Sequence, residues 1–286
     1  MYFDPPTEAQ IAKIRDNTGY SEEHLEEAVK KIKNWLQEQP HLPNVHDDKR
    51  LKILYMHCKG RMKKVHESLD TYYSMKNIAH EILFDRDPLK PWFKDTNEIC
   101  YYLPLPSLTD ELCRVTLLGL LDPSLSKYNS KNVLRVAYMS HDVRYLNEFC
   151  PTDIYIMDCA QGSPGHITKY PFRMLKWIHD FGLIGYRVQL KSAHFINAPI
   201  FLNVFIAVVK LILKPKLFKR LHVHRNGVGN LYDYVPQRIM PNEYGGEAGP
   251  LRDLWEKWQQ NLILHRDWFL ENDKYKTDES KRPRKS

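Results

Sequence analysis

The feature that most constrains this chain is an apolar segment inside an otherwise ordinary sequence. Residues 198–213 read Ala-Pro-Ile-Phe-Leu-Asn-Val-Phe-Ile-Ala-Val-Val-Lys-Leu-Ile-Leu. Pro199 suits the first turn of a helix, and beyond it only Asn203 and Lys210 interrupt the apolar side chains. A surface helix of a soluble domain normally keeps a polar face. This helix must therefore have apolar surroundings on most of its sides.

Three arrangements could supply such surroundings. A helix over these residues would be about 24 Å long, shorter than the ~30 Å hydrocarbon core of a bilayer, and it contains Lys210. These two facts argue against a membrane span. A helix buried in the core is the simplest alternative. A lid that closes an apolar cavity with one face and meets a membrane with the other fits best.

The charges around this segment favour the lid. No acidic residue occurs between Asp180 and Asp233, and the formal net charge of the whole chain is +7. Each basic residue near an anionic membrane surface contributes about 1 kcal/mol to binding. The alternative interpretation of the charge run is a basic face in contact with solvent. Nucleic acid is another polyanion that such a run could bind, but the sequence has no recognised nucleic-acid-binding motif. The basic residues of this stretch are Arg187, Lys191, Lys210, Lys214, Lys216, Lys219, Arg220 and Arg225.

Hydrophobic periodicity divides the chain into a helical part and an α/β part. The first ~80 residues carry apolar side chains at helical spacing, and Asp87-Pro88 and Lys90-Pro91 end this part. Beyond it, short apolar runs alternate with helical patterns, which predicts an α/β domain with a largely parallel sheet. We expect strands at 114–121, 154–157, 187–197 and 221–224 and helices at 173–182 and 251–270, with 133–149 ambiguous.

These patterns give three segments. We expect an N-terminal helical domain over 1–92, an α/β domain over 93–272 and a disordered basic tail over 273–286. The run 281–285 in that tail could alternatively be a nuclear signal. The five cysteines form no C-x-x-C pair, and the N-terminus does not resemble a signal peptide, so we expect a cytoplasmic protein.

Motifs for catalysis or metal binding are weak. His194, His222 and His224 could meet on neighbouring strands, but no carboxylate or cysteine is placed to complete a metal site. Asp158 at a strand end has no evident catalytic partner, although a hydrolase could use it with His194. The Gly-rich runs 162–165 and 226–230 match neither a nucleophile elbow nor a phosphate-binding loop. We therefore expect no enzyme activity, no metal and no cofactor.

Four passages resemble the CRAL-TRIO family of lipid-transfer proteins, and within it the alpha-tocopherol transfer proteins and their insect relatives. One is Pro-Asn-Glu-Tyr-Gly-Gly-Glu at 241–247, and another is the strand into the apolar helix at 193–199, together with 221–224. The remaining passages are Leu-Asp-Thr-Tyr-Tyr at 69–73 and Asp-Pro at 122–123 with Lys-Tyr at 127–128.

The resemblance implies a fold and a mode of action. It implies an N-terminal helical domain packed on an α/β lipid-binding domain, a mostly parallel sheet as the floor of a cavity, and 199–213 as an apolar gate helix. It also implies a helix at 133–149. Strand alternation directs Val188 and Leu190 towards the cavity. The full set of expected pocket residues is Tyr138, His141, Tyr155, Met157, Phe181, Leu183, Val188, Leu190, Ile200, Phe201, Val204, Phe205 and Val208.

The resemblance also implies a phosphoinositide-binding surface. Lys191, Lys216 and Arg220 match the family by position, and Lys214 and Lys219 join them from the charge run. The chain departs from the family at 53–56, where Ile-Leu-Tyr-Met replaces Arg-Phe-Leu-Arg and removes two arginines. It departs again at 158–162, where the glycine that follows Asp158 comes one place late.

We therefore expect a monomeric, soluble carrier of one hydrophobic isoprenoid-like ligand. Tocopherol, retinoids, carotenoids and a juvenile-hormone-type terpenoid all fit, and exchange would occur at phosphoinositide-containing membranes through reversible peripheral contact. The alternative is a signalling adaptor that binds phosphoinositide or a protein partner through the same fold without cargo. The choice depends on whether the cavity is open.

Overall fold

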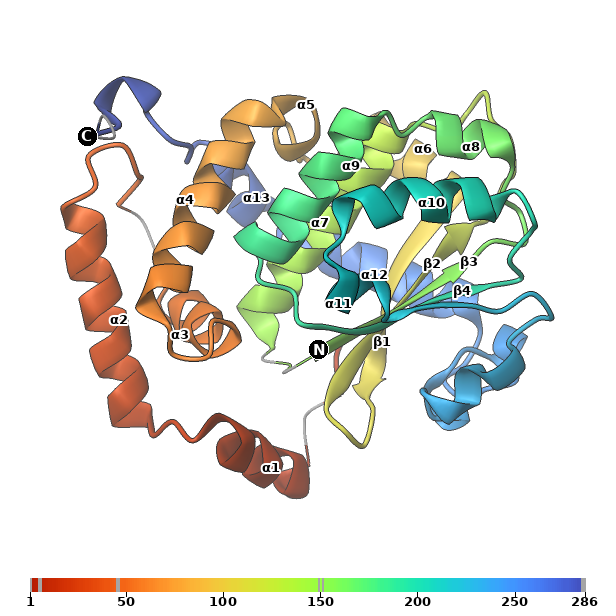
Figure 1. Cartoon of the computed structure of the whole chain (residues 1–286), viewed down its shortest axis with the longest axis horizontal. Coiled ribbons are helices and arrows are strands. Elements are labelled where there is room, and N and C mark those ends of the chain that lie inside the picture. The colour runs from red at the N-terminus through yellow and green to blue at the C-terminus, as the bar shows by residue number, and fades with distance from the viewer. Residues whose placement is uncertain (1, 5–6, 45–46, 149, 151, 284–286) are drawn as a thin grey trace.

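The first part of the chain is a group of helices that lies beside a mixed α/β unit (Figure 1). The computed structural model describes residues 2–4, 7–44, 47–148, 150 and 152–283. Ser21 caps α2 by accepting a hydrogen bond from the His24 N–H at 3.2 Å, as expected for a serine before an amphipathic helix. The helices of this part are α1 Glu8–Thr18, α2 Glu22–Gln37, α3 Asp48–His57, α4 Met62–Ile78 and α5 His80–Leu83.

The second part is built on a five-stranded sheet of order β1-β2-β3-β4-β5. β1 and β2 pair antiparallel, and the remaining neighbours pair parallel. The predicted α/β class with a mostly parallel sheet is therefore confirmed. The strands are β1 Cys100–Leu108, β2 Cys113–Leu120, β3 Thr152–Asp158, β4 Leu190–Ile196 and β5 Leu221–Val223.

The sequence did not predict β1. Pro104 and Pro106 interrupt its run, and proline cannot donate to a sheet ladder, so it normally argues against a strand. β1 tolerates both because it lies at the edge of the sheet, and its register with β2 shifts between Pro104 and Leu108.

Helices of the second part pack against this sheet. The segment 133–149 forms α7, as the family resemblance implies, and the expected helix at 251–270 is divided at His265 into α12 and α13. Trp258 of α12 donates a hydrogen bond to Ser140 of α7 at 3.0 Å. The helices of this part are α6 Pro91–Ile99, α7 Ser130–Asn147, α8 Pro164–Thr168, α9 Phe172–His179, α10 Leu202–Ile212, α11 Pro215–Phe218, α12 Leu251–Leu264 and α13 Arg266–Asn272, with a π-helical turn η1 at Asp180–Gly185.

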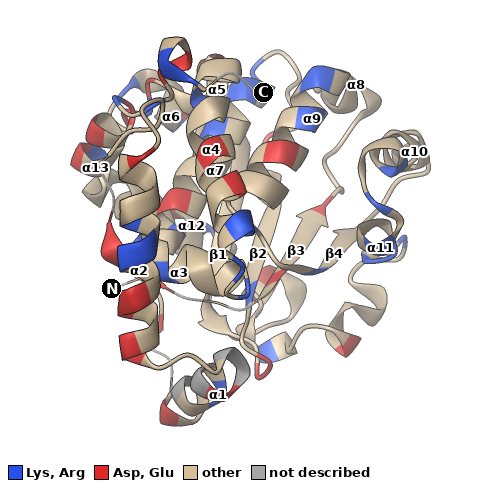
Figure 2. Cartoon of the chain, turned by 60° about the vertical axis from the view of Figure 1, so that its left-hand side comes forward, with Lys and Arg blue, Asp and Glu red and all other residues tan. Residues whose placement is uncertain are grey.

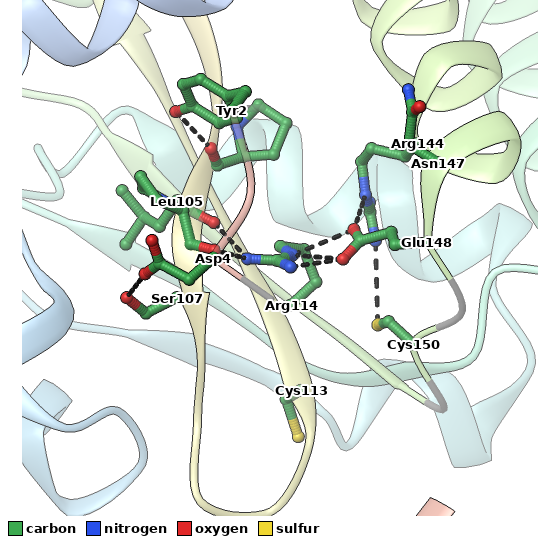
Figure 3. Close-up of polar contacts among 12 residues, drawn as sticks. Tyr2, Asp4, Leu105, Ser107, Cys113, Arg114, Arg144, Asn147, Glu148 and Cys150 are labelled. Carbon is green, nitrogen blue, oxygen red and sulfur yellow. Dashed lines mark hydrogen bonds and ion pairs between the residues drawn. The ribbon is translucent and has the colours of Figure 1, made fainter. Parts of the chain in front are cut away.

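Arg114 joins the strands to the end of α7 (Figure 3). Its Nε donates to Glu148 Oε1 at 3.0 Å and its Nη1 to the carbonyl of Pro106 at 2.7 Å. Arg144 donates to the same carboxylate at 3.3 Å. Because Arg114 is 1% exposed, a buried charge is paired here, as stability requires.

The C-terminal segment does not have the disorder that we expected from residue 273. Asp278 N–H donates to the carbonyl of His41 at 2.9 Å, and Arg282 pairs with Asp70 at 2.7 Å. Thr277 is buried. The polar composition that suggested disorder is satisfied by these contacts with the N-terminal helices, so the expectation is wrong for 273–283. Residues 284–286 lie outside the described residues.

Candidate ligand-binding cavity

A cavity of about 460 Å³ lies between the sheet and the helices above it. Its floor follows the strand register. Leu118, Met157 and Phe195 are neighbours across β2, β3 and β4, while Tyr155 and Ala193 form the next row. Residues paired across a sheet share one face, so these side chains form a continuous floor. The volume suits one small lipid, since ligand pockets commonly measure ~300–1,000 Å³.

The walls of the cavity are formed by the helices that cover the sheet and by the predicted gate helix, α10. Leu190 shares the cavity face with Ala193 because the register of β3 and β4 shifts by one residue between Asp153 and Ile154. The predicted pocket residues that line the cavity are Tyr138, His141, Tyr155, Met157, Leu183, Val188, Leu190, Phe201 and Phe205. Further lining residues include Tyr102, Leu134, Ala137, Val209, Ile212 and Leu221.

The structure corrects the choice of residues on the apolar helix. Ile200 is 80% exposed and Val204 is 67% exposed, and neither lines the cavity. Val208 also does not line it. Because an α-helix turns about 100° per residue, only one face of α10 can meet the cavity. The sequence could not identify that face, since the helix is apolar almost all round.

Phe181 is a second correction. It is 1% exposed and does not line the cavity. Its ring stacks on Tyr72 of α4 with centroids 5.3 Å apart and meets Tyr138 edge-on at 4.8 Å. The π-helical turn in which it lies directs the side chain towards the N-terminal helices, so it belongs to the core between the two parts of the chain.

One group of polar side chains that line the cavity lies at the junction of α7, β1 and β3. His141 Nε2 is 2.9 Å from the Tyr102 hydroxyl and 3.3 Å from the Tyr155 hydroxyl. The Tyr138 hydroxyl has no hydrogen-bond partner among the described residues. Burial, helped by Arg144, lowers the pKa of His141 to about 3. The ring is therefore neutral at physiological pH, and so are the tyrosines.

No lysine or arginine lines the cavity within the described part of the chain. Asp158 lines it, but its carboxylate is already satisfied. Oδ1 accepts from the Asn197 side-chain amide at 2.8 Å and the Ala160 N–H at 2.9 Å, and Oδ2 accepts from the Tyr244 hydroxyl at 2.7 Å. Asn197 has a positive φ of 50° and lies between β4 and α10. Asp158 therefore holds the connection that leads into α10.

The predicted basic residues fall into two groups. Lys191 pairs with Glu111, and Arg220 donates to the Leu190 carbonyl, so both have partners within the fold. Lys214, Lys216 and Lys219 are exposed and form no salt bridge with the described residues. In Figure 2 these residues colour the region of α11 blue beside the mostly tan α10. Lys214, Lys216 and Lys219, not the whole set, offer free charge next to the exposed apolar face.

The described residues do not form the metal site or the hydrolase site that the sequence left open. The histidine cluster is real, because His194 Nδ1 lies 3.0 Å from His224 Nε2 and its ring stacks on His222. Even so, no group of His, Cys, Asp or Glu among the described residues could hold a metal ion. The two residues proposed for a hydrolase have other partners, since Asp158 binds Asn197 and His194 binds Ser192 at 2.8 Å.

Sequence reasoning missed Tyr102 because it missed β1. A signal was available, since Tyr101-Tyr102-Leu103 is an aromatic and apolar run of the kind that favours strands. The two prolines, which argue against a strand, outweighed this signal.

Among the described residues, no helix combines the length and the apolar character needed to cross a membrane.

Comparison with known proteins identifies the family to which this fold belongs. Residues 97–246 match the CRAL/TRIO domain family, and residues 21–93 match the Pinta-like UBA domain. The chain belongs to the CRAL/TRIO family of lipid-binding and lipid-transfer proteins.

Individual relatives are similar over shorter stretches. The human alpha-tocopherol transfer protein-like protein is 34% identical over 87 residues, which cover 30% of this chain and 25% of that protein. Mouse clavesin-2 is 29% identical over 160 residues, which cover 55% of this chain and 48% of that protein. The chain thus spans between a quarter and a half of the length of these relatives. The crystal structure of Sfh5 superposes on this chain with a TM-score of 0.53 and 12% sequence identity. The match covers 86% of this chain and 99% of the Sfh5 chain, which shows a shared fold.

Proposed function

We propose that this chain is a monomeric, non-enzymatic carrier that takes up one neutral isoprenoid-like lipid and exchanges it at phosphoinositide-containing membranes from the cytoplasm. The observation that carries the proposal is the apolar cavity of about 460 Å³ without a lysine or arginine in its described lining. Burial of apolar surface supplies roughly 25 cal/mol per Å². An ionic headgroup would have to be buried without a counter-charge, which is strongly unfavourable.

The position of α10 supports its role as the gate. Phe205, Val209 and Ile212 face the cavity, whereas Val204 and Leu211 are exposed. An exposed apolar face beside free lysines suits an anionic membrane surface. Contact with the membrane would give this face an apolar environment, and movement of α10 would then open the cavity.

A matched pair of substitutions tests whether the cavity holds the ligand. Ala193 lies on the floor between Tyr155 and Leu221, so Ala193→Phe should fill the space and weaken binding of retinol or tocopherol by about tenfold or more. Ala207 lies on the exposed side of α10, so Ala207→Phe should leave the affinity unchanged. Fluorescence titration measures both.

Equal affinities in the two variants would contradict a ligand in this cavity. A chain that binds none of the neutral lipids yet still binds phosphoinositide liposomes would instead be the signalling adaptor.

A further inference from the structure

One cluster of polar groups in the cavity comes from α7 and β3, and the wall under α10 is apolar. Tyr138 and His141 are three residues apart on α7, which places them on one face of the helix. The Tyr155 hydroxyl reaches His141 Nε2 from β3 at 3.3 Å, and all three residues line the cavity. The opposite wall under α10 is formed by Phe201, Phe205, Val209 and Ile212.

The hydrogen-bonding capacity of this cluster is not used up. A single ring nitrogen offers one lone pair or one proton, yet His141 Nε2 has both the Tyr102 and the Tyr155 hydroxyls as neighbours, at 2.9 and 3.3 Å. The Tyr155 hydroxyl also forms a hydrogen bond with that of Tyr102, and since a hydroxyl donates once and accepts through two lone pairs, it keeps acceptor capacity for another partner. Tyr138 is 3% exposed, and its hydroxyl has no partner among the described residues. Buried polar groups without partners are rare and call for an explanation.

We infer that the hydroxyls of Tyr138 and Tyr155 beside His141 form the headgroup subsite of the cavity, and that this subsite selects a lipid whose polar end is a single uncharged oxygen group, an alcohol or a carbonyl. The inference rests on the proposed carrier function. The lipid enters with its oxygen towards α7, and its apolar body lies under α10.

The charges around the subsite explain the selection against acids. His141 is neutral, and the described lining supplies no lysine or arginine. His179, which also lines the cavity, is paired with Asp180 at 2.8 Å. A carboxylate or phosphate would lose its hydration without gaining an ionic partner. An alcohol or carbonyl loses less and completes the unused hydrogen bonds.

The experiment compares three retinoids that differ in one group. All-trans-retinol carries a hydroxyl, axerophthene carries a hydrogen in its place, and retinoic acid carries a carboxylate. We expect the wild-type chain to bind retinol on the order of tenfold more tightly than axerophthene and to bind the acid more weakly than the alcohol. The double variant Tyr138→Phe/Tyr155→Phe should bind retinol and axerophthene equally, with the axerophthene affinity unchanged.

Tyr234→Phe is the control. Tyr234 does not line the cavity and is 42% exposed, so this variant should keep the preference for the alcohol. Tyr138→Phe should also unfold at the same or a higher temperature than the wild type, because it removes a hydroxyl without a partner.

The outcomes separate this inference from the carrier function. A preference for retinol that survives in the double variant, or a loss that is equal for retinol and axerophthene, overturns the headgroup subsite while leaving the carrier function intact. Binding of none of the retinoids, and of no other neutral isoprenoid lipid, by the wild type overturns both.

Discussion

Asp142 has no exposed surface, and it connects three parts of the chain. It pairs with Arg50 of α3 at 3.0 Å and with Arg86 at 2.6 Å, and Arg86 pairs in turn with Asp273 at 2.6 Å. Burial alone would raise the pKa of Asp142, but Arg50, Arg86 and Lys76 together lower it below its ordinary value. This residue therefore fastens the N-terminal helices and the C-terminal segment to α7.

Replacing Asp142 by Asn should be strongly destabilising, because it removes the counter-charge of Arg50 and leaves the buried Arg86 with Asp273 alone. We expect a loss of about 3–5 kcal/mol in the free energy of unfolding. A lowered folded-state pKa stabilises the fold above the unfolded value of about 3.9, and this contribution is lost as the pH falls through the folded value. Urea unfolding at a series of pH values from 7 to 3 should therefore show a shallower acid decline in the variant.

The control is Asp95→Asn, which changes an exposed carboxylate and should alter the free energy of unfolding by less than about 0.5 kcal/mol. If Asp142→Asn were as stable as this control, the role of Asp142 between the domains would be refuted.

The residues of the site were predictable to different degrees. Tyr138, His141, Tyr155 and Met157 follow from the family resemblance and from strand alternation, and all four line the cavity. The hydrogen bond between Tyr102 and His141 could not be predicted, because Tyr102 lies on β1, which the prolines concealed. A pairing between elements far apart in sequence depends on how those elements pack.

At the scale of elements, α10 illustrates what periodicity can and cannot provide. Its composition predicted a helix with apolar surroundings, and a helix forms at Leu202–Ile212. Its orientation depends on packing against the cavity and on the connection held by Asp158. Leu202 is consequently 5% exposed, whereas Leu211 is 79% exposed.

The prediction at the scale of elements concerns the three lysines beside α10. The triple variant Lys214→Ala/Lys216→Ala/Lys219→Ala should bind liposomes that contain phosphatidylinositol bisphosphate more weakly by about 3 kcal/mol at low salt, since each charge contributes about 1 kcal/mol. Retinol affinity should not change, because none of these lysines lines the cavity. Liposome co-sedimentation measures the difference.

A triple variant of Lys30, Lys63 and Lys257, which are exposed on other helices, removes the same charge from other surfaces. Equal loss of binding in the two triple variants would mean that net charge, not the surface beside α10, determines membrane contact.

At the scale of the whole molecule, the division into a helical part and an α/β part was predictable and the cavity was not. Alternating apolar runs and helical patterns were enough to predict a helical part followed by an α/β part, and the structure confirms both. Side-chain rotamers and strand register together determine the cavity volume of about 460 Å³ and the absence of lysine and arginine from the described lining of the cavity. Neither can be read from one sequence. These two properties carry the functional proposal.

The most direct test of the central claim is native mass spectrometry of the purified chain after incubation with a mixture of neutral isoprenoid lipids and phospholipids, followed by extraction and identification of what is bound. We predict a complex of one neutral lipid per chain, which is lost in the Ala193→Phe variant. A chain that stays empty, or one that retains phospholipid in preference to every neutral lipid, would contradict the account.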